Sequence, residues 1–203
     1  MARPALTTDA LDAMRQRLVA AALDVYRQAG LEALSFRRLA DVMGLSHTLP
    51  YRYFAHKEAL LVAMRVHCTQ QFEAFVRARE TVDAGWTAQL DSVAAAYVAF
   101  VQDDPQAYQL IFTTEQPPPD RYPELLAARR ALFDHIVDVL AGGVDAGNIR
   151  GEPRQLAHLF WVSFHGLMTL HVANQLVHGQ TLQDLVTPLM RRLLGADAAA
   201  TGA

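Results

Sequence analysis

Residues 47–57 bring together several side chains that commonly bind phosphate groups. The stretch HTLPYRYFAHK places Tyr51, Arg52, Tyr53, His56 and Lys57 within seven positions. Arginine, lysine and tyrosine side chains, together with the free amides of a helix N-terminus, are typical donors to nucleic-acid phosphates. The pattern therefore favours binding of a polyanion. A helical hairpin whose charges are merely solvated is the alternative.

The elements that must position these side chains are two short helices. Ser35 is expected to cap a helix with the sequence FRRLADVM, which Gly44 closes in a left-handed conformation. Ser46 is expected to cap a second helix, HTLPYRYF, in which Pro50 is the fourth residue and its missing N–H costs little. Two such helices joined by MGLS form a helix-turn-helix, whose second helix recognises DNA.

The remaining chain shows apolar residues at helical spacing and no convincing strand. The sequence predicts an all-α protein of about nine helices, with a small N-terminal three-helix unit before a larger helical body. Gly30 should end the first helix, and PPP in residues 117–119 marks a loop. The other helices are expected at 8–29, from 56 or 57 toward 82, and at 86–103, 105–113, 121–144, 153–178 and 182–194, with residues 195–203 fraying.

Charge and composition narrow the function classes. The net charge of the 203 residues is −3, but residues 1–66 carry +3 and the remainder −6, so only the first third is suited to a polyanion. No apolar run is long enough for a membrane span, no secretory signal is visible, and the single cysteine, Cys68, excludes an internal disulfide. We expect a cytoplasmic protein without cofactor or metal. An enzyme is disfavoured because no phosphate-binding loop, dinucleotide fingerprint or nucleophile elbow is present.

Residues 35–54, SFRRLADVMGLSHTLPYRYF, resemble the DNA-binding domain of the TetR/AcrR family of bacterial transcription regulators. AALDVYRQAG before them and KEALL after them extend the resemblance over residues 12–72. Residues 104–112, DPQAYQLIF, and the segment FWVSFHGL with Trp161, His165 and Gly166 resemble the family's WHG-type C-terminal domain, over residues 85–195. At the site of Pro50 the family more often has Leu, Ile or Val.

The resemblance implies a homodimeric, ligand-responsive repressor that binds a palindromic double-stranded DNA operator. A helical ligand-binding or adaptor module without operator binding is the alternative, which the side chains at 51–57 argue against. The DNA-binding candidates are Ser35, Arg37, Ser46, His47, Thr48, Tyr51, Arg52, Tyr53, His56 and Lys57.

The region 153–178 is apolar on nearly all sides, which requires burial against two partners. One partner can be its own domain and the other a twofold-related copy, and in the family the last two helices form the dimer bundle. The expected interface residues are Leu170, Leu182, Leu185, Leu189 and Leu193.

A small apolar or aromatic ligand is expected in the helical body. Aromatic residues at helical spacing are more often core than ligand contacts, and buried histidines are more often hydrogen-bonded core residues. His165 can accordingly be a ligand contact or a structural residue. The candidates are Trp86, Tyr97, Tyr108, Phe112, His135, Trp161, Phe164, His165 and Met168.

Overall fold

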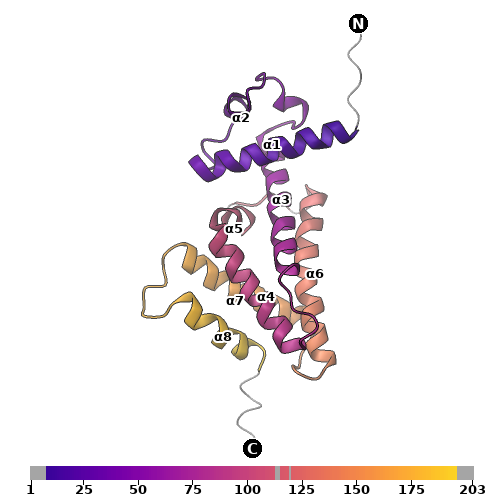
Figure 1. Ribbon diagram of the computed structural model, residues 1–203, viewed down its shortest axis with the longest axis vertical. Coiled ribbons are helices and arrows are strands. Elements are labelled where there is room, and N and C mark those ends of the chain that lie inside the picture. Colours follow the sequence, from indigo (N-terminus) through magenta and orange to yellow (C-terminus); the bar gives the residue numbers. More distant parts are fainter. Residues whose placement is uncertain (1–7, 113–114, 119, 196–203) are drawn as a thin grey trace, which may run out of the picture. The chain divides into compact units, whose positions relative to one another are not determined.

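The computed structural model describes residues 8–112, 115–118 and 120–195, and all regular structure in these ranges is helical (Figure 1). The predicted all-α class is therefore confirmed. Eight α-helices and one 3₁₀ helix are present in the described ranges: α1 (Thr8–Ala29), α2 (Phe36–Met43), η1 (Pro50–Arg52), α3 (Lys57–Arg77), α4 (Trp86–Asp103), α5 (Pro105–Phe112), α6 (Pro123–Asp145), α7 (Pro153–Val172) and α8 (Leu182–Leu193).

Two compact units divide the chain. Unit 1 holds the described residues up to Cys68 together with the segment Pro118–Leu125. Unit 2 holds Thr69–Pro117 and the described residues from Leu126 onward. Helix α3 therefore begins in unit 1, and its last part belongs to unit 2.

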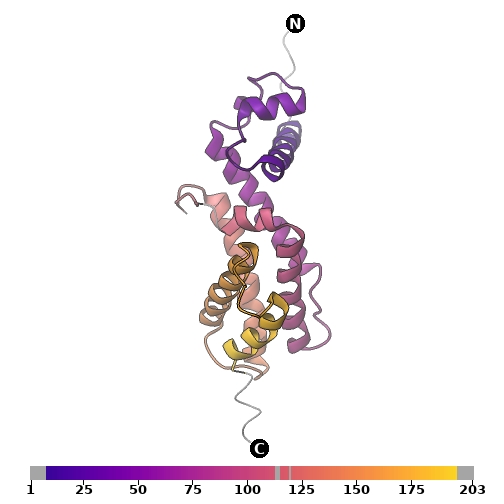
Figure 2. The same ribbon diagram turned by 90° about the vertical axis from the view of Figure 1, so that its left-hand side faces the viewer.

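Unit 1 is built from amphipathic helices, and capping residues in the sequence explain where these helices begin and end. Helix α2 packs against α1 (Figures 1 and 2), burying Leu39 and Ala40 of α2. Ser35 Oγ accepts the N–H of Arg38 at 3.1 Å, so the predicted N-cap is confirmed. Gly44 closes α2 at φ 64°, a left-handed conformation that favours glycine, and Gly30 ends α1 in the same region at φ 76°.

The predicted second helix of the helix-turn-helix is wrong as an α-helix. Only Pro50–Arg52 are helical, in a 3₁₀ turn, and Ser46 caps nothing because the turn has no side-chain cap. The amide of Leu49 bonds to the carbonyl of Ser46 at 2.9 Å, a three-residue step. Pro50 has no N–H to bond the same carbonyl from the α-helical position, so the tighter turn continues. The proline ring is buried, as its core-facing position predicted.

Unit 2 encloses an aromatic core between helices. Helix α4 contacts α5 and α7, and α8 lies against α7 (Figures 1 and 2). Phe72 of α3 stacks on Phe100 of α4 with ring centroids 4.3 Å apart, and Phe160 stacks on Phe164 of α7 at 4.2 Å. The large rings supply the apolar area that holds these helices together.

Two predicted helices end earlier than expected. Helix α3 ends at Arg77 rather than near Val82, and α7 ends at Val172 rather than 178. After α7 the chain turns at Asn174, which has a positive φ of 56°. Asparagine tolerates this conformation better than most residues, so it stops a helix that the apolar pattern alone would extend.

Candidate nucleic-acid interface and ligand cavity

Helix α2, η1 and the turn between them present polar side chains to solvent. Arg37, His47, Thr48, Tyr51 and Arg52 are all exposed. The ring of Tyr51 meets the buried ring of Phe36 edge-on, with centroids 4.7 Å apart, which fixes the exposed tyrosine against α2. The exposed set forms a face on which phosphate and base contacts can be made.

Four of the exposed DNA-binding candidates already have polar partners. His47 Nε2 lies 2.7 Å from Oδ1 of Asp41. The Lys57 ammonium donates to the carbonyl of Leu31 at 3.0 Å, and Ser46 and Thr48 share a hydroxyl contact of 3.3 Å. The side chains of Arg37 and Arg52 have no ion-pair or hydrogen-bond partner within the described ranges. Their guanidinium groups are thus the free donors of the surface.

Three other candidates have structural duties. Ser35 caps α2, and His56 Nδ1 accepts the N–H of Ala59 at 3.2 Å at the start of α3. Tyr53 is only 9% exposed, so its side chain is buried in unit 1 and does not lie on the outward face that the sequence predicted. Little of its side chain remains for a phosphate contact.

Arg15 of α1 is a positioning residue that sequence reasoning missed. Its guanidinium donates to the carbonyl of Tyr53 and lies 4.5 Å from the centroid of the Phe54 ring. It thereby holds the end of the η1 segment against α1. No local signal marks it, because an arginine beside an apolar helix stripe looks like ordinary surface.

A cavity of about 410 Å³ opens within unit 2. Of the predicted ligand residues, Tyr97, Phe112 and Trp161 line it. Phe133 and Phe160 complete its aromatic wall. The polar and charged residues around it are Thr69, Gln116, Arg129, Arg130, Asp134, Arg154 and His158.

The other predicted ligand residues do not line this cavity. Trp86 donates its indole N–H to the carbonyl of Val139 at 2.7 Å and packs against Gly143. Phe164 and Met168 are fully buried in the core. Their large side chains therefore join helices instead of facing the open space.

Tyr108 and His165 form a pair behind the cavity wall. The Tyr108 hydroxyl lies 2.7 Å from Nδ1 of His165. Burial raises the pKa of Tyr108 to about 12, so the phenol keeps its proton and donates it to Nδ1. Burial also lowers the pKa of His165, which favours the neutral ring that can accept this bond. The Tyr97 pKa is raised by burial and by its neighbour Tyr108.

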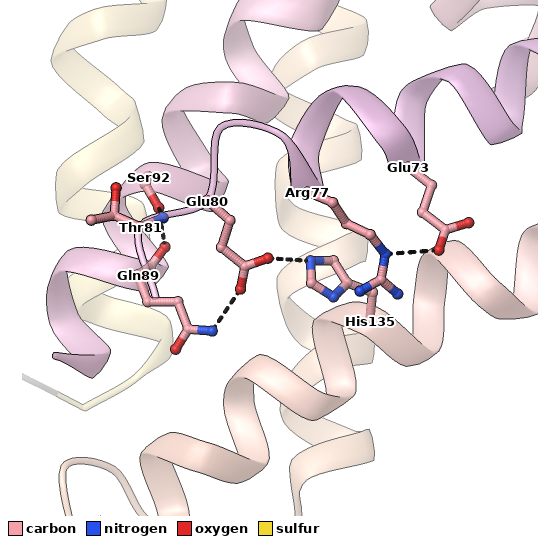
Figure 3. Close-up of polar contacts among 7 residues, drawn as sticks. All are labelled: Glu73, Arg77, Glu80, Thr81, Gln89, Ser92 and His135. Atoms are coloured by element: carbon pink, nitrogen blue, oxygen red, sulfur yellow. Dashed lines mark hydrogen bonds and ion pairs between the residues drawn. The ribbon is translucent and has the colours of Figure 1, made fainter. Parts of the chain in front are cut away.

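His135 belongs to a polar cluster that Figure 3 shows. Its Nε2 atom lies 3.0 Å from Oε2 of Glu80, and both side chains are less than 10% exposed (5% and 7%). Gln89 Nε2 donates to the other Glu80 oxygen at 2.6 Å. Beside them, Arg77 pairs with Glu73 at 2.9 Å. The cluster links the segment after α3 with α4 and α6, a structural role rather than a contact in the cavity.

An apolar stripe on α7 faces solvent. Leu159, Val162 and Leu170 are exposed, and Gly166 between them is exposed with open space beyond its Cα hydrogen. Leu182 does not fit the predicted seam, because it is only 1% exposed and faces the interior of its own unit. The predicted residues Leu185, Leu189 and Leu193 of α8 are partly exposed.

The described ranges contain neither a candidate metal cluster nor a candidate membrane-spanning helix. No group of three histidine, cysteine, aspartate or glutamate side chains there is arranged to hold a metal ion. No helix in these ranges is sufficiently long and apolar to cross a bilayer.

Comparison with known sequences gives two family matches, one in the N-terminal and one in the C-terminal part of the chain. Residues 18–64 match the family described as bacterial regulatory proteins, tetR family, and residues 90–193 match the tetracyclin repressor-like C-terminal domain. The chain belongs to the TetR family. Helix α2 and η1 lie inside the first match, and most of the cavity-lining residues inside the second. TetR-family membership makes the protein a DNA-binding transcriptional regulator.

Individual relatives agree with this assignment. The transcriptional regulator RutR of Escherichia coli K12 is 29% identical over 181 residues, covering 87% of this chain and 84% of RutR. The transcriptional activator FasR of Mycolicibacterium smegmatis is 25% identical over 68% of this chain and 65% of its own. A protein of unknown function from Rhodococcus sp. RHA1 superposes with a TM-score of 0.79 at 26% identity, over 90% of this chain and 94% of its own.

Proposed function

We propose that this TetR-family regulator is a homodimeric repressor that binds a palindromic operator and releases it when a small molecule enters unit 2. It would act in the cytoplasm, where the chromosome lies. The observation that carries the proposal is the 410 Å³ cavity with aromatic walls, a size in the range of small-molecule sites. An exposed polar turn in unit 1 supplies the surface for DNA.

The dimer part of the proposal rests on the α7 stripe. Leu159, Val162 and Leu170 leave an apolar face uncovered on one helix. Gly166 lets a second backbone approach there closely, since a Cβ at that position would meet nothing within the unit. Two copies of the same face form a self-complementary, twofold interface. A twofold dimer in turn requires two half-sites in the DNA.

Ligand response follows if the ligand distinguishes two arrangements of the dimer. A small molecule shifts DNA occupancy only through its different affinities for the DNA-bound and free forms. Changing occupancy from about 99% to about 1% needs roughly 5.5 kcal/mol of preference. A cavity that buries most of an apolar ligand in only one of the two arrangements can supply a preference of this order.

The test begins with selection of binding sites from a random DNA library. The selected sequences should be palindromic, and fluorescence anisotropy should show affinity for them falling steeply as salt rises. In a reporter strain, expression from a promoter overlapping the selected site should rise when the regulator gene is removed. A fall in expression would make the protein an activator. No enrichment of any sequence would favour the adaptor alternative.

A further inference from the structure

The cavity of unit 2 combines apolar walls with a set of positive charges. Three arginines, Arg129, Arg130 and Arg154, line it, against one aspartate, Asp134. Arg154 is already neutralised, since its guanidinium lies 2.7 Å from Oδ1 of Asp134. The other two arginines leave the cavity with an excess of positive charge.

Of Arg129 and Arg130, Arg129 is the better candidate for a ligand contact. It is partly buried, whereas Arg130 is exposed. Its guanidinium donates to the amide oxygen of Gln116, and Gln116 in turn donates to the carbonyl of Leu110 at 3.2 Å. No carboxylate pairs with Arg129 in the part of the chain that the structure describes. Loss of hydration lowers the pKa of Arg129.

A partly buried guanidinium with a single neutral acceptor has unused donors. Arginine presents five N–H groups in a planar fork that fits a carboxylate with two parallel bonds. A ligand carboxylate would therefore offset the charge that the protein leaves unpaired. A single carboxylate suffices, because Arg154 is already paired with Asp134 and the exposed Arg130 is solvated.

The rest of the cavity selects the body of the ligand. Phe112, Phe133 and Trp161 form an aromatic wall, and Phe133 also holds the ring of His158 at 4.5 Å between centroids. Walls of this kind stabilise aliphatic or aromatic carbon through burial of apolar surface. A small polar metabolite would leave the wall unused.

We infer that the cavity binds an amphipathic monocarboxylate, with its carboxylate on Arg129 and its apolar body against Phe112, Phe133 and Trp161. This inference rests on the proposed ligand-responsive function and specifies its ligand class. The free carboxylate is the recognised group, so the same apolar body carrying an uncharged amide should bind less tightly.

Calorimetric titration of the full chain with matched pairs of compounds tests the inference. The probes are octanoate, decanoate and naphthalene-1-acetate, each compared with its primary amide at pH 7.5. We expect at least one carboxylate to bind about tenfold or more tighter than its amide, because hydrogen bonds to a charged group are strong. Arg129→Gln should reduce that ratio to about one while leaving amide affinity unchanged, and Arg129→Lys should give an intermediate ratio.

Arg150→Gln is the matched control, because Arg150 is exposed and does not line the cavity. It removes the same charge and should keep the full preference for the carboxylate. Equal affinity of carboxylate and amide in the unmodified protein would overturn the inference. So would a preference that survives Arg129→Gln, or failure of all three carboxylates to bind at millimolar concentration.

DNA release, measured on the same samples with selected DNA, separates this inference from the proposed function. An Arg129-dependent carboxylate that binds without releasing DNA would uphold the ligand class and contradict the proposed ligand response. Release by uncharged compounds alone would uphold the response and contradict the ligand class.

Discussion

The hydroxyl of Tyr108 and Nδ1 of His165 lie 2.7 Å apart, and neither side chain lines the cavity. This pairing favours a structural role for His165 over a ligand contact. Tyr108→Phe should lower the free energy of unfolding by about 1–3 kcal/mol, because it leaves a partly buried ring nitrogen without its donor. Urea denaturation measures this loss.

Tyr97→Phe is the matched control for that change. The Tyr97 hydroxyl is buried and makes no hydrogen bond of good geometry within the described ranges. Removing it should change stability by less than about 0.5 kcal/mol or raise it slightly. Ligand affinity should be unaffected by His165→Ala. A large loss of ligand affinity in a folded His165→Ala variant would return His165 to the binding site.

Acid should destabilise the protein through its buried histidines. Burial lowers the pKa of His135 below 6.5, and the nearby Arg77 acts in the same direction, although Glu80, Glu73 and Asp138 oppose it. The unfolded state therefore binds the proton more tightly. The contribution of neutral His135 to the free energy of unfolding is therefore fully present above pH 6.5. It decreases as the pH falls below 6.5, and the decrease stops below the pKa of His135 in the folded state.

Urea denaturation between pH 7.5 and 5 measures this dependence. His135→Gln should flatten the curve in this range, and His178→Gln, which alters an exposed side chain, should leave it as it is. An unchanged slope in the His135 variant would assign the acid sensitivity to other groups. His67 and His165, whose pKa values burial also lowers, are the first of these.

The contact between Gly143 and Trp86 forbids a larger residue at position 143. A Cβ there would clash with the indole ring, which is itself fixed by its bond to Val139. Gly143→Ala should cost about 1–3 kcal/mol of stability, as overpacking generally does. Gly142→Ala is the control, since the nearest atom to its new Cβ is 3.9 Å away. That change should be neutral or stabilising by up to about 1 kcal/mol. Equal Tm values for the two variants would show that the indole moves freely.

The α7 stripe should be essential for the dimer. Val162→Glu would place a charge in the proposed apolar seam, and desolvating it costs several kcal/mol. Sedimentation velocity should then show a monomer. Val82→Glu is a close control, because both valines are 65% exposed and Val82 lies outside α7 and α8. A Val162→Glu protein that still sediments as a dimer would move the interface elsewhere.

Arg52 should contribute directly to DNA binding. Its exposed guanidinium is free in the described structure, so no internal contact is lost when it is removed. Arg52→Ala should weaken binding to selected DNA by about 1–3 kcal/mol if it reads a base, with little effect on scrambled DNA. If it contacts a phosphate, both affinities and the salt slope should fall together. Arg150→Ala, which removes an exposed arginine of unit 2, should alter neither.

The sequence predicted the helices that local signals define. Ser35, Gly30 and Gly44 act at helix ends as expected, because capping depends on neighbouring residues only. The prediction of an α-helix after Ser46 was wrong, and the reason is local as well. Pro50 fits the first turn of an α-helix, but it fits a 3₁₀ turn equally, and sequence spacing cannot separate the two.

The cavity was predicted less completely because its wall depends on how helices pack. Tyr97, Phe112 and Trp161 were named from aromatic character alone, and the same rule also selected the half-buried Trp86 and the core residue Phe164, which do not line the cavity. Arg129 carries no aromatic signal and lies on a helix with many charged neighbours. Contacts between helices that are distant in the sequence determine which residues of α6 face the cavity. The periodicity of apolar residues in the sequence does not reveal these contacts.

The segment Pro118–Leu125 packs with unit 1 although it lies between α5 and α6 in the chain, and Arg121 in it pairs with Glu58 at 3.4 Å. A genetic fusion that transplants only residues 8–68 onto another effector body would therefore lack part of this unit's own packing. A single cut after residue 68 is therefore not a suitable boundary for exchanging this unit between regulators. A chimaera should carry residues 118–125 as well, which means exchanging two separate segments of the chain rather than one.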